Sequence, residues 1–227
     1  MLLNLEFACI AGFRGITMNV LAVGAHYDDV ELACSGSLIK HVGSGDKVTI
    51  VVATTSAYTD KDGNEIRSTK TAQQEGRQAA KIIGADLIEL GYETFHIQFN
   101  EETTLTVLKI VEELEIDCVY SHWFNDIHRD HSNLGKAVMM AARRVPRFLM
   151  YRSNYYDTEP LFAGNYYIDI TDVMEKKIEV IKAHRSELER LRYAWLDFFT
   201  KQNENDGQKI GTRYAECFQV VRYLGTI

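Results

Sequence analysis

Two short polar clusters hold the side chains in this sequence that are best suited to chemistry. The first, His26, Asp28 and Asp29, directly follows the apolar run 20–23. The second, NDIHRDH at 125–131, follows another apolar run at 118–123. Burying such charged groups without partners is costly, so each cluster implies a partner such as a metal ion. For the first cluster, an ordinary helix N-cap formed by Asp28 or Asp29 is the alternative.

Taken together, the two clusters predict a divalent-metal site. Each follows a strand-like run and precedes a helix-like run, and ligands of open α/β sheets bind at the carboxyl ends of the strands. His26, Asp29 and His131 would then supply two imidazoles and one carboxylate, with a fourth position left for water. This donor set is typical of catalytic zinc, and it also suits non-haem Fe(II).

The elements that must position these clusters alternate along the chain. Strands are predicted at 20–23, 47–53, 85–90, 118–123, 148–152, 166–170 and 215–224. Helices are predicted at 30–42, 71–83, 103–114 and 132–144, with one long helix over 173–191 and a polar loop over 54–70. This order predicts an α/β fold with a Rossmann-like, mostly parallel β-sheet flanked by helices on both faces.

Composition limits the classes of protein to which the chain can belong. Its 227 residues are enough for one sizeable core, so we expect a single domain over 1–227. The formal charge of −7 argues against a nucleic-acid partner. No apolar stretch approaches the ~20 residues of a membrane span. Residues 1–17 lack the basic start of a secretory signal, so we expect a variable extension or a natural start at Met18.

The four cysteines, Cys9, Cys34, Cys118 and Cys217, show no CxxC spacing, and three of them lie in apolar runs. Such cysteines are typical of small buried side chains in a reducing compartment. We therefore expect a cytoplasmic protein.

The motifs AHYDD at 25–29 and HRDH at 128–131 resemble the AHPDD and HPDH signatures of the PIG-L/LmbE-like deacetylases. The likeness extends to QEGRQAAKIIGA, YIDIT and YAECF, and so spans most of the chain. Tyr27 and Arg129 stand where the family usually has proline. These two departures concern the shape of the loops and the lining of the pocket, because neither position supplies a metal ligand.

This resemblance implies a zinc-dependent hydrolase that removes an acetyl group from an N-acetylated amino sugar or sugar conjugate. His26, Asp29 and His131 would hold Zn²⁺. Asp28, which the coordination shell does not need, would be the general base for a metal-activated water. His128, as an imidazolium, would stabilise the oxyanion and donate to the leaving nitrogen.

Further roles follow from the resemblance and from position. Asp130 is expected to orient His128 and to raise the pKa of its imidazole. Arg152, just past a strand, and His184, in a helix, are expected substrate contacts, with solvated side chains as the alternative. The family also suggests homo-oligomers, trimers or hexamers. The aromatic residues near the C-terminus are expected in the core or at a subunit contact, and not as a platform for the ligand: Tyr193, Trp195, Phe198 and Phe199.

Several other polar residues are candidates for the pocket or for structural roles. Ser56 and Tyr58 are candidates for the pocket wall, with a mobile loop as the alternative. The arginine that family members carry near the start of the helix over 71–83 is missing, because Ala72 and Gln73 stand there. Its candidate replacements are Arg67, Lys70 and Arg77, and the histidines expected to be structural or exposed are His41, His96 and His122.

Two alternatives to the sugar deacetylase stay open. One is a metal-dependent hydrolase of another amide or ester, because the sequence of the loops that set specificity does not indicate a substrate. The other is a noncatalytic metal-binding scaffold, against which the intact Asp28 and His128 argue. A nucleotide-binding Rossmann module fits poorly, because GAHYDD is not a glycine fingerprint and its two carboxylates would repel a pyrophosphate.

Overall fold

A seven-stranded sheet lies at the centre of the structure, a computed structural model that describes residues 17–225. The expected extension over 1–17 therefore lies, apart from Thr17, outside the described residues. The strand order is β5-β2-β1-β6-β7-β9-β8. These strands are β1 (Asn19–Gly24), β2 (Lys47–Thr54), β5 (Asp86–Tyr92), β6 (Cys118–His122), β7 (Arg147–Tyr151), β8 (Tyr166–Asp169) and β9 (Ala215–Tyr223).

The sheet is mostly parallel, as the sequence predicts. Strand β1 pairs in parallel with β2 and β6, and β5 and β7 extend the sheet in parallel on either side. Strand β9 runs antiparallel to both β7 and β8. The order of connection reverses between β1 and β6, and in open α/β sheets ligands bind at this switch point, beyond the carboxyl ends of the strands.

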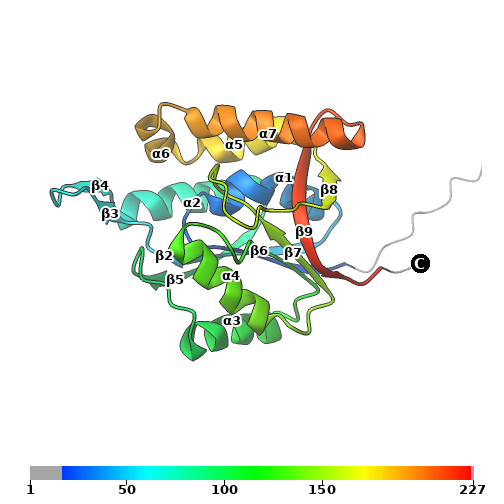
Figure 1. Ribbon diagram of the computed structural model, residues 1–227, viewed down its shortest axis with the longest axis horizontal. Coiled ribbons are helices and arrows are strands. Elements are labelled where there is room, and N and C mark those ends of the chain that lie inside the picture. Colours follow the sequence, from blue (N-terminus) through cyan, green and yellow to red (C-terminus); the bar gives the residue numbers. More distant parts are fainter. Residues whose placement is uncertain (1–16, 226–227) are drawn as a thin grey trace, which may run out of the picture.

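Helices cover both faces of the sheet, which confirms the predicted fold class (Figure 1). Helices α1 (Asp29–Gly43), α2 (Thr69–Ile83) and α5 (Met174–Lys182) pack together on one face, with α6 (Arg185–Arg190) and α7 (Ala194–Ile210) beyond them. Helices α3 (Glu101–Glu113) and α4 (Arg129–Ala141) cover the other face. Alternate residues of β1 point to the two faces, so Val20 and Ala22 join one core cluster while Leu21 and Val23 join the other.

The single long helix predicted over 173–191 is wrong. The chain leaves the helical conformation at His184, with φ −83° and ψ 58°, which separates α5 from α6. The buried His184 side chain lies beside Glu31 of α1, with 3.3 Å between Nε2 and Oε1. This contact with another helix overrides a helical propensity that is strong throughout the segment. The predicted polar loop also contains a short hairpin, formed by β3 (Tyr58–Thr59) and β4 (Glu65–Arg67).

Glu216, in the YAECF motif, joins three elements in the core. Its carboxylate accepts hydrogen bonds from the backbone N–H groups of Gly36 and Ser37 in α1, at 2.8 and 2.7 Å. Lys177 of α5 donates to the same carboxylate at 2.6 Å, and neither side chain of this ion pair is exposed. A buried pair is tolerated when its hydrogen-bonding capacity is met in this way. Glu216 thus ties β9 to α5 and to α1, the helix that begins at Asp29.

Tyr27, at the position where proline is usual, is anchored by its side chain. It is 1% exposed, its hydroxyl donates to Glu89 of β5, and its backbone N–H donates to Ser56 Oγ at 2.9 Å. Its ring packs directly on Gly76 of α2, where any Cβ atom would overlap ring atom Cδ1.

We expect Gly76→Ala to lower the free energy of unfolding by about 1–3 kcal/mol, because a fully buried ring has no room to move. Denaturant titration measures the effect. Gly43→Ala is the matched control: it lies at the end of α1 with open space around the added Cβ, so it should be neutral or stabilising. Equal effects of the two substitutions would contradict the packing of Tyr27 on Gly76.

No helix within residues 17–225 is both long and apolar enough to cross a membrane.

Candidate active site

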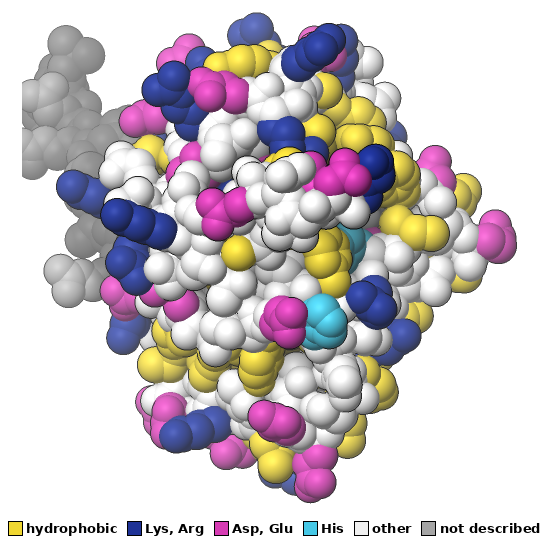
Figure 2. All heavy atoms as spheres, turned by 90° about the vertical axis from the view of Figure 1, so that its left-hand side faces the viewer, with side chains coloured by type: hydrophobic (Ala, Val, Ile, Leu, Met, Phe, Trp, Pro, Cys, Tyr) yellow, Lys and Arg dark blue, Asp and Glu magenta, His cyan; other side chains and the backbone are white. Residues whose placement is uncertain are grey.

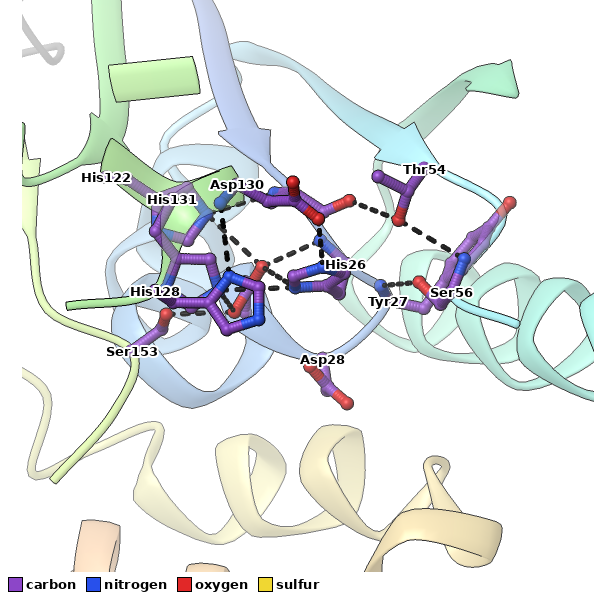
Figure 3. A network of polar contacts seen from close by, with 12 residues as sticks. His26, Tyr27, Asp28, Thr54, Ser56, His122, His128, Asp130, His131 and Ser153 are labelled. Atoms are coloured by element: carbon purple, nitrogen blue, oxygen red, sulfur yellow. Dashed lines mark hydrogen bonds and ion pairs between the residues drawn. The ribbon is translucent and has the colours of Figure 1, made fainter. Parts of the chain in front are cut away.

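The two polar clusters meet at the switch point between β1 and β6 (Figure 3). Strand β1 ends at Gly24, two residues before His26, and α1 begins at Asp29. Strand β6 ends at His122, and α4 begins at Arg129, so His131 lies in the first turn of that helix. The parallel pairing of β1 with β6 therefore brings together side chains that are far apart in the sequence.

The structure brings the three predicted metal ligands into mutual contact. His26 Nδ1 lies 3.2 Å from His131 Nε2 and 3.4 Å from Asp29 Oδ2, and His131 Nε2 lies 3.2 Å from Asp29 Oδ1. Ligands about 2.0–2.1 Å from a tetrahedral zinc ion stand roughly 3.3–3.4 Å from one another. The spacing of the donor atoms therefore fits such an ion.

The charges around these atoms also favour a cation. Burial opposes ionisation of Asp29, but His131 and His122 outweigh it and hold the pKa of the carboxyl well below its usual value. Burial likewise opposes the charge on His131, but Asp29 and Asp126 raise the pKa of its imidazole to about 10. The cluster thus attracts positive charge, which a divalent ion can supply in place of a proton.

Another polar side chain fixes the orientation of each metal-ligand candidate. Asp130 Oδ2 lies 3.1 Å from His26 Nε2, and Asp126 Oδ2 lies 3.4 Å from His131 Nδ1. Carboxylates in these positions fix the tautomer and orientation of metal-binding histidines. Ser153 Oγ donates to Asp29 Oδ1 at 2.9 Å, which fixes the carboxylate as well. Sequence reasoning missed Asp126 and Ser153.

Two further histidines lie close enough to be ligands themselves. The donor atoms of His26, His128 and His131 lie within 4.8 Å of one another, as do those of Asp29, His122 and His131. However, His128 Nδ1 accepts the backbone N–H of Asp130 at 3.2 Å, and His122 Nε2 accepts that of Ala25 at 3.0 Å. Because these lone pairs are engaged, His26, Asp29 and His131 remain the metal-ligand candidates.

Of the two alternatives expected for His122, structural or exposed, the structure excludes the second and places the side chain within the site. Its side chain is fully buried, its ring stacks on that of His131 with 4.1 Å between centroids, and its Nε2 lies 3.2 Å from Asp29 Oδ2. Its place at the carboxyl end of β6 is the signal that would have identified it, since the same rule selected His26. His41, in contact with Asp46 and Tyr120, and the exposed His96 fit the expectation.

Asp28 lies beside the metal-ligand candidates on a strained turn. Its backbone φ is 131°, a conformation that non-glycine residues rarely adopt and that is tolerated mainly at functional sites. Burial raises the pKa of its carboxyl to about 7, although Arg67 opposes the shift. Arg67 Nη1 lies 3.4 Å from Asp28 Oδ2 and donates to the backbone oxygen of Tyr27 at 3.1 Å. Among the three candidate cations, Arg67 is therefore the one placed at the cluster.

The expected contact between Asp130 and the ring of His128 is not made. The Asp130 carboxylate instead accepts the backbone N–H groups of Phe95 and Ile97, at 2.6 and 3.1 Å, in addition to contacting His26. Burial, with the nearby His131 and His26, lowers the pKa of His128 to about 4, opposite to the expected direction. His128 is thus neutral and caps α4 through Nδ1, which leaves the proton on Nε2.

The two expected substrate contacts, Arg152 and His184, are directed towards other groups than the metal-ligand candidates. Arg152 donates to Asp157 and Gln202, at 3.1 Å each. It therefore points away from the donor cluster formed by His26, Asp29 and His131. His184 is 2% exposed and lies between Glu31 and Arg67, with 3.5 Å between its Nδ1 and Arg67 Nη2. Neither side chain lines the cavity that opens onto the metal-ligand candidates, because the position of a residue past a strand or in a helix does not fix the direction of its side chain.

A cavity of about 440 Å³ opens onto the donor cluster. At this end of the molecule, histidine side chains lie next to exposed hydrophobic ones (Figure 2). Ser56 and Tyr58, the two loop residues expected in the pocket wall, do line it. The described residues lining the cavity are His26, Asp28, Asp29, Ser56, Tyr58, Arg67, Thr94, Phe95, Ile127, His128, His131, Ser153, Asn154, Tyr156, Glu187, Arg190 and Trp195.

Comparison with known proteins agrees with the chemistry of this site. Residues 21–142 match the PIG-L family model, described as GlcNAc-PI de-N-acetylase. The chain is 34% identical over 141 residues to the uncharacterized deacetylase YaiS of Escherichia coli K12, covering 59% of this chain and 73% of that protein. It is 25% identical over 244 aligned positions to diacetylchitobiose deacetylase of Thermococcus kodakarensis, covering 97% and 89%.

The fold, too, is found among solved structures. N,N′-diacetylchitobiose deacetylase from Pyrococcus horikoshii superimposes with a TM-score of 0.77 at 23% identity, covering 90% of this chain and 84% of that one.

Proposed function

Since the chain belongs to the PIG-L family and is a deacetylase, a hydrolase of amide bonds, we propose that it removes the acetyl group of an N-acetylated amino sugar or sugar conjugate with the help of Zn²⁺. The observation that carries this proposal is the spacing of His26, Asp29 and His131, which fits a tetrahedral zinc ion, in the lining of a cavity that Asp28 also lines. The diacetylchitobiose deacetylase of Thermococcus kodakarensis, a relative along almost the whole chain, is named for an N-acetylated sugar.

His26 Nδ1, His131 Nε2 and the Asp29 carboxylate would hold the metal, while Asp130 and Asp126 keep the two imidazoles oriented. When bound, zinc lowers the pKa of water towards ~7 and polarises the amide carbonyl. The same donor set accepts Fe(II), so zinc is proposed from the chemistry of the reaction and from the family.

Asp28 is the proposed general base. A carboxyl group with a pKa of about 7 is matched to proton transfer near neutral pH: it takes a proton from the attacking water and can pass it to the leaving amine. Arg67 pairs with the ionised form and also fixes the strained turn through the Tyr27 carbonyl.

His128 is the proposed oxyanion donor, in its neutral form. With Nδ1 occupied by the Asp130 backbone N–H, its Nε2–H is available to the oxygen of the tetrahedral intermediate. Asp130 contributes by fixing His26 and the loop at 95–97, not by charging His128.

Acetate release from three classes of compound tests the proposal: a glycoside of N-acetylglucosamine, an N-acetylated amino acid and an acetate ester. We expect the glycoside to have the highest kcat/KM. A preference for the amino acid or the ester would favour the alternative hydrolase. No release of acetate from any of the three compounds would favour the remaining alternative, a noncatalytic metal-binding scaffold.

The remaining expectations stay predictions. We propose a cytoplasmic homo-oligomer, a trimer or hexamer, whose substrate is its small-molecule partner. Of the aromatic residues near the C-terminus, Phe199 is 1% exposed and packs in a core cluster with Leu32, Ile181 and Leu188, so it is a core residue. Tyr193 is exposed and remains a candidate for a subunit contact.

A further inference from the structure

Phe95, in the loop between β5 and α3, is both strained and exposed. Its backbone φ is 69°, a left-handed conformation that bulky residues avoid. Its ring remains 42% exposed, so the strain is not offset by burial of the side chain. A glycine or asparagine would fill this turn with less strain. Strain that persists without a packing gain is typical of functional positions.

The surrounding structure holds this residue firmly in place. The Phe95 N–H donates to Asp130 Oδ2 at 2.6 Å, and the Ile97 N–H donates to Asp130 Oδ1 at 3.1 Å. Ile97 is itself buried in the core, and its backbone oxygen accepts a hydrogen bond from Asn133 of α4 at 2.9 Å. The loop is thus fixed on both sides of the exposed ring, so its position is determined by the fold.

The ring of Phe95 lines the cavity close to the reacting groups. Its centroid lies 5.6 Å from that of His128, and the His128 ring in turn lies 4.8 Å from His26 and 4.4 Å from His131. On its other side it meets Tyr58 edge-on at 6.4 Å. Rings in contact have centroids about 4.5–7 Å apart. A ligand ring stacked on Phe95 would therefore be separated from the donor cluster by about the width of one ring.

We propose that Phe95 is the platform on which the sugar ring of the substrate lies. The inference rests on the proposed function and deepens it. The C–H bonds of a pyranose form an apolar face that suits the electron-rich face of an aromatic ring. Its acetamido group is attached directly to the ring, and so would reach His26 and His131 from this position. The substrate class is therefore a cyclic N-acetylamino sugar with one apolar face free, in preference to an acyclic N-acetylated compound.

Phe95→Leu tests the platform, because it removes the aromatic face and keeps apolar volume. We expect KM for a glycoside of N-acetylglucosamine to rise about five- to tenfold, with kcat within about twofold of wild type. The KM for an acyclic N-acetylated amine should not change. Phe99→Leu is the control: Phe99 is 49% exposed on the same loop but is not among the described residues that line the cavity. A loss of kcat at unchanged KM would instead assign Phe95 to holding His128, and would overturn the platform.

Phe95→Gly gives a readout that does not depend on activity. It removes the strain together with the ring, so we expect Tm to rise by a few degrees while KM rises as for leucine. A merely structural residue would show a fall in Tm with no change in KM, and that result would overturn the proposal.

Calorimetric binding of a glucosamine glycoside, the product of the reaction, separates failure of this inference from failure of the proposed function. Weaker binding by Phe95→Leu than by wild type and Phe99→Leu supports the platform, even if no acetate is released and the deacetylase proposal falls. Equal binding by all three proteins overturns the platform and leaves the deacetylase proposal intact. A wild-type protein that binds no amino sugar also overturns it.

Discussion

Replacing Asp28 by asparagine should slow acetate release by about two to four orders of magnitude, the range expected when a general base is lost. Asparagine keeps the size of the side chain and removes the group that accepts the proton. Because Asp28 is not among the three metal-ligand candidates, the protein should bind the metal as wild type does. Single-turnover kinetics together with elemental analysis of the purified protein measure both properties.

Asp62→Asn is a suitable control, since it removes an exposed carboxylate in the hairpin loop and should change neither rate nor metal content. An Asp28→Asn enzyme within tenfold of wild type would refute the assignment of the base. A variant that lost its metal would show that Asp28 is a ligand.

Removing the metal with a chelator should abolish acetate release, and added Zn²⁺ should restore it. The physical reason is that the donor cluster has no other strong electrophile for the carbonyl oxygen. Metal binding should also raise the free energy of unfolding, by roughly 4 kcal/mol when free zinc exceeds the dissociation constant a thousandfold. Thermal unfolding with and without zinc measures this.

His131→Ala should bind zinc weakly and show little shift in Tm when zinc is added, whereas His96→Ala, an exposed histidine, should behave as wild type. Full activity in a protein shown to be free of metal would contradict a metal-dependent reaction. Recovery with Fe(II) and not with Zn²⁺ would correct the identity of the ion.

The fold and the three metal-ligand candidates could be predicted from sequence because both depend on local patterns. Apolar runs that alternate with helical spacing define the sheet, and side chains just past the carboxyl ends of its strands share one edge. His26, Asp29 and His131 all follow from this rule. The rule says which residues reach the edge, but not what each side chain contacts there.

The rest depends on directions that only the packed structure sets. Asp130 turns towards His26 and the loop at 95–97 instead of His128, and Arg152 turns towards Asp157. His184 breaks a helix that local propensity favours, because its partner Glu31 lies on another helix. Phe95 carries no motif, and its role follows from a backbone angle and an exposed ring that the sequence does not reveal.

The contacts of the Glu216 carboxylate can form only late in the synthesis of the chain. Helix α1 begins at Asp29, one of the metal-ligand candidates, but the hydrogen bonds that Gly36 and Ser37 make to Glu216 form only after residue 216 has been synthesised. Domains that emerge from the ribosome fold as units. Until residue 216 has been synthesised, Lys177 also lacks its partner in the buried ion pair. A nascent chain that already contains both polar clusters therefore still lacks the contacts that hold α1 and α5 to β9, and we expect the site to be complete only after β9 has joined the sheet.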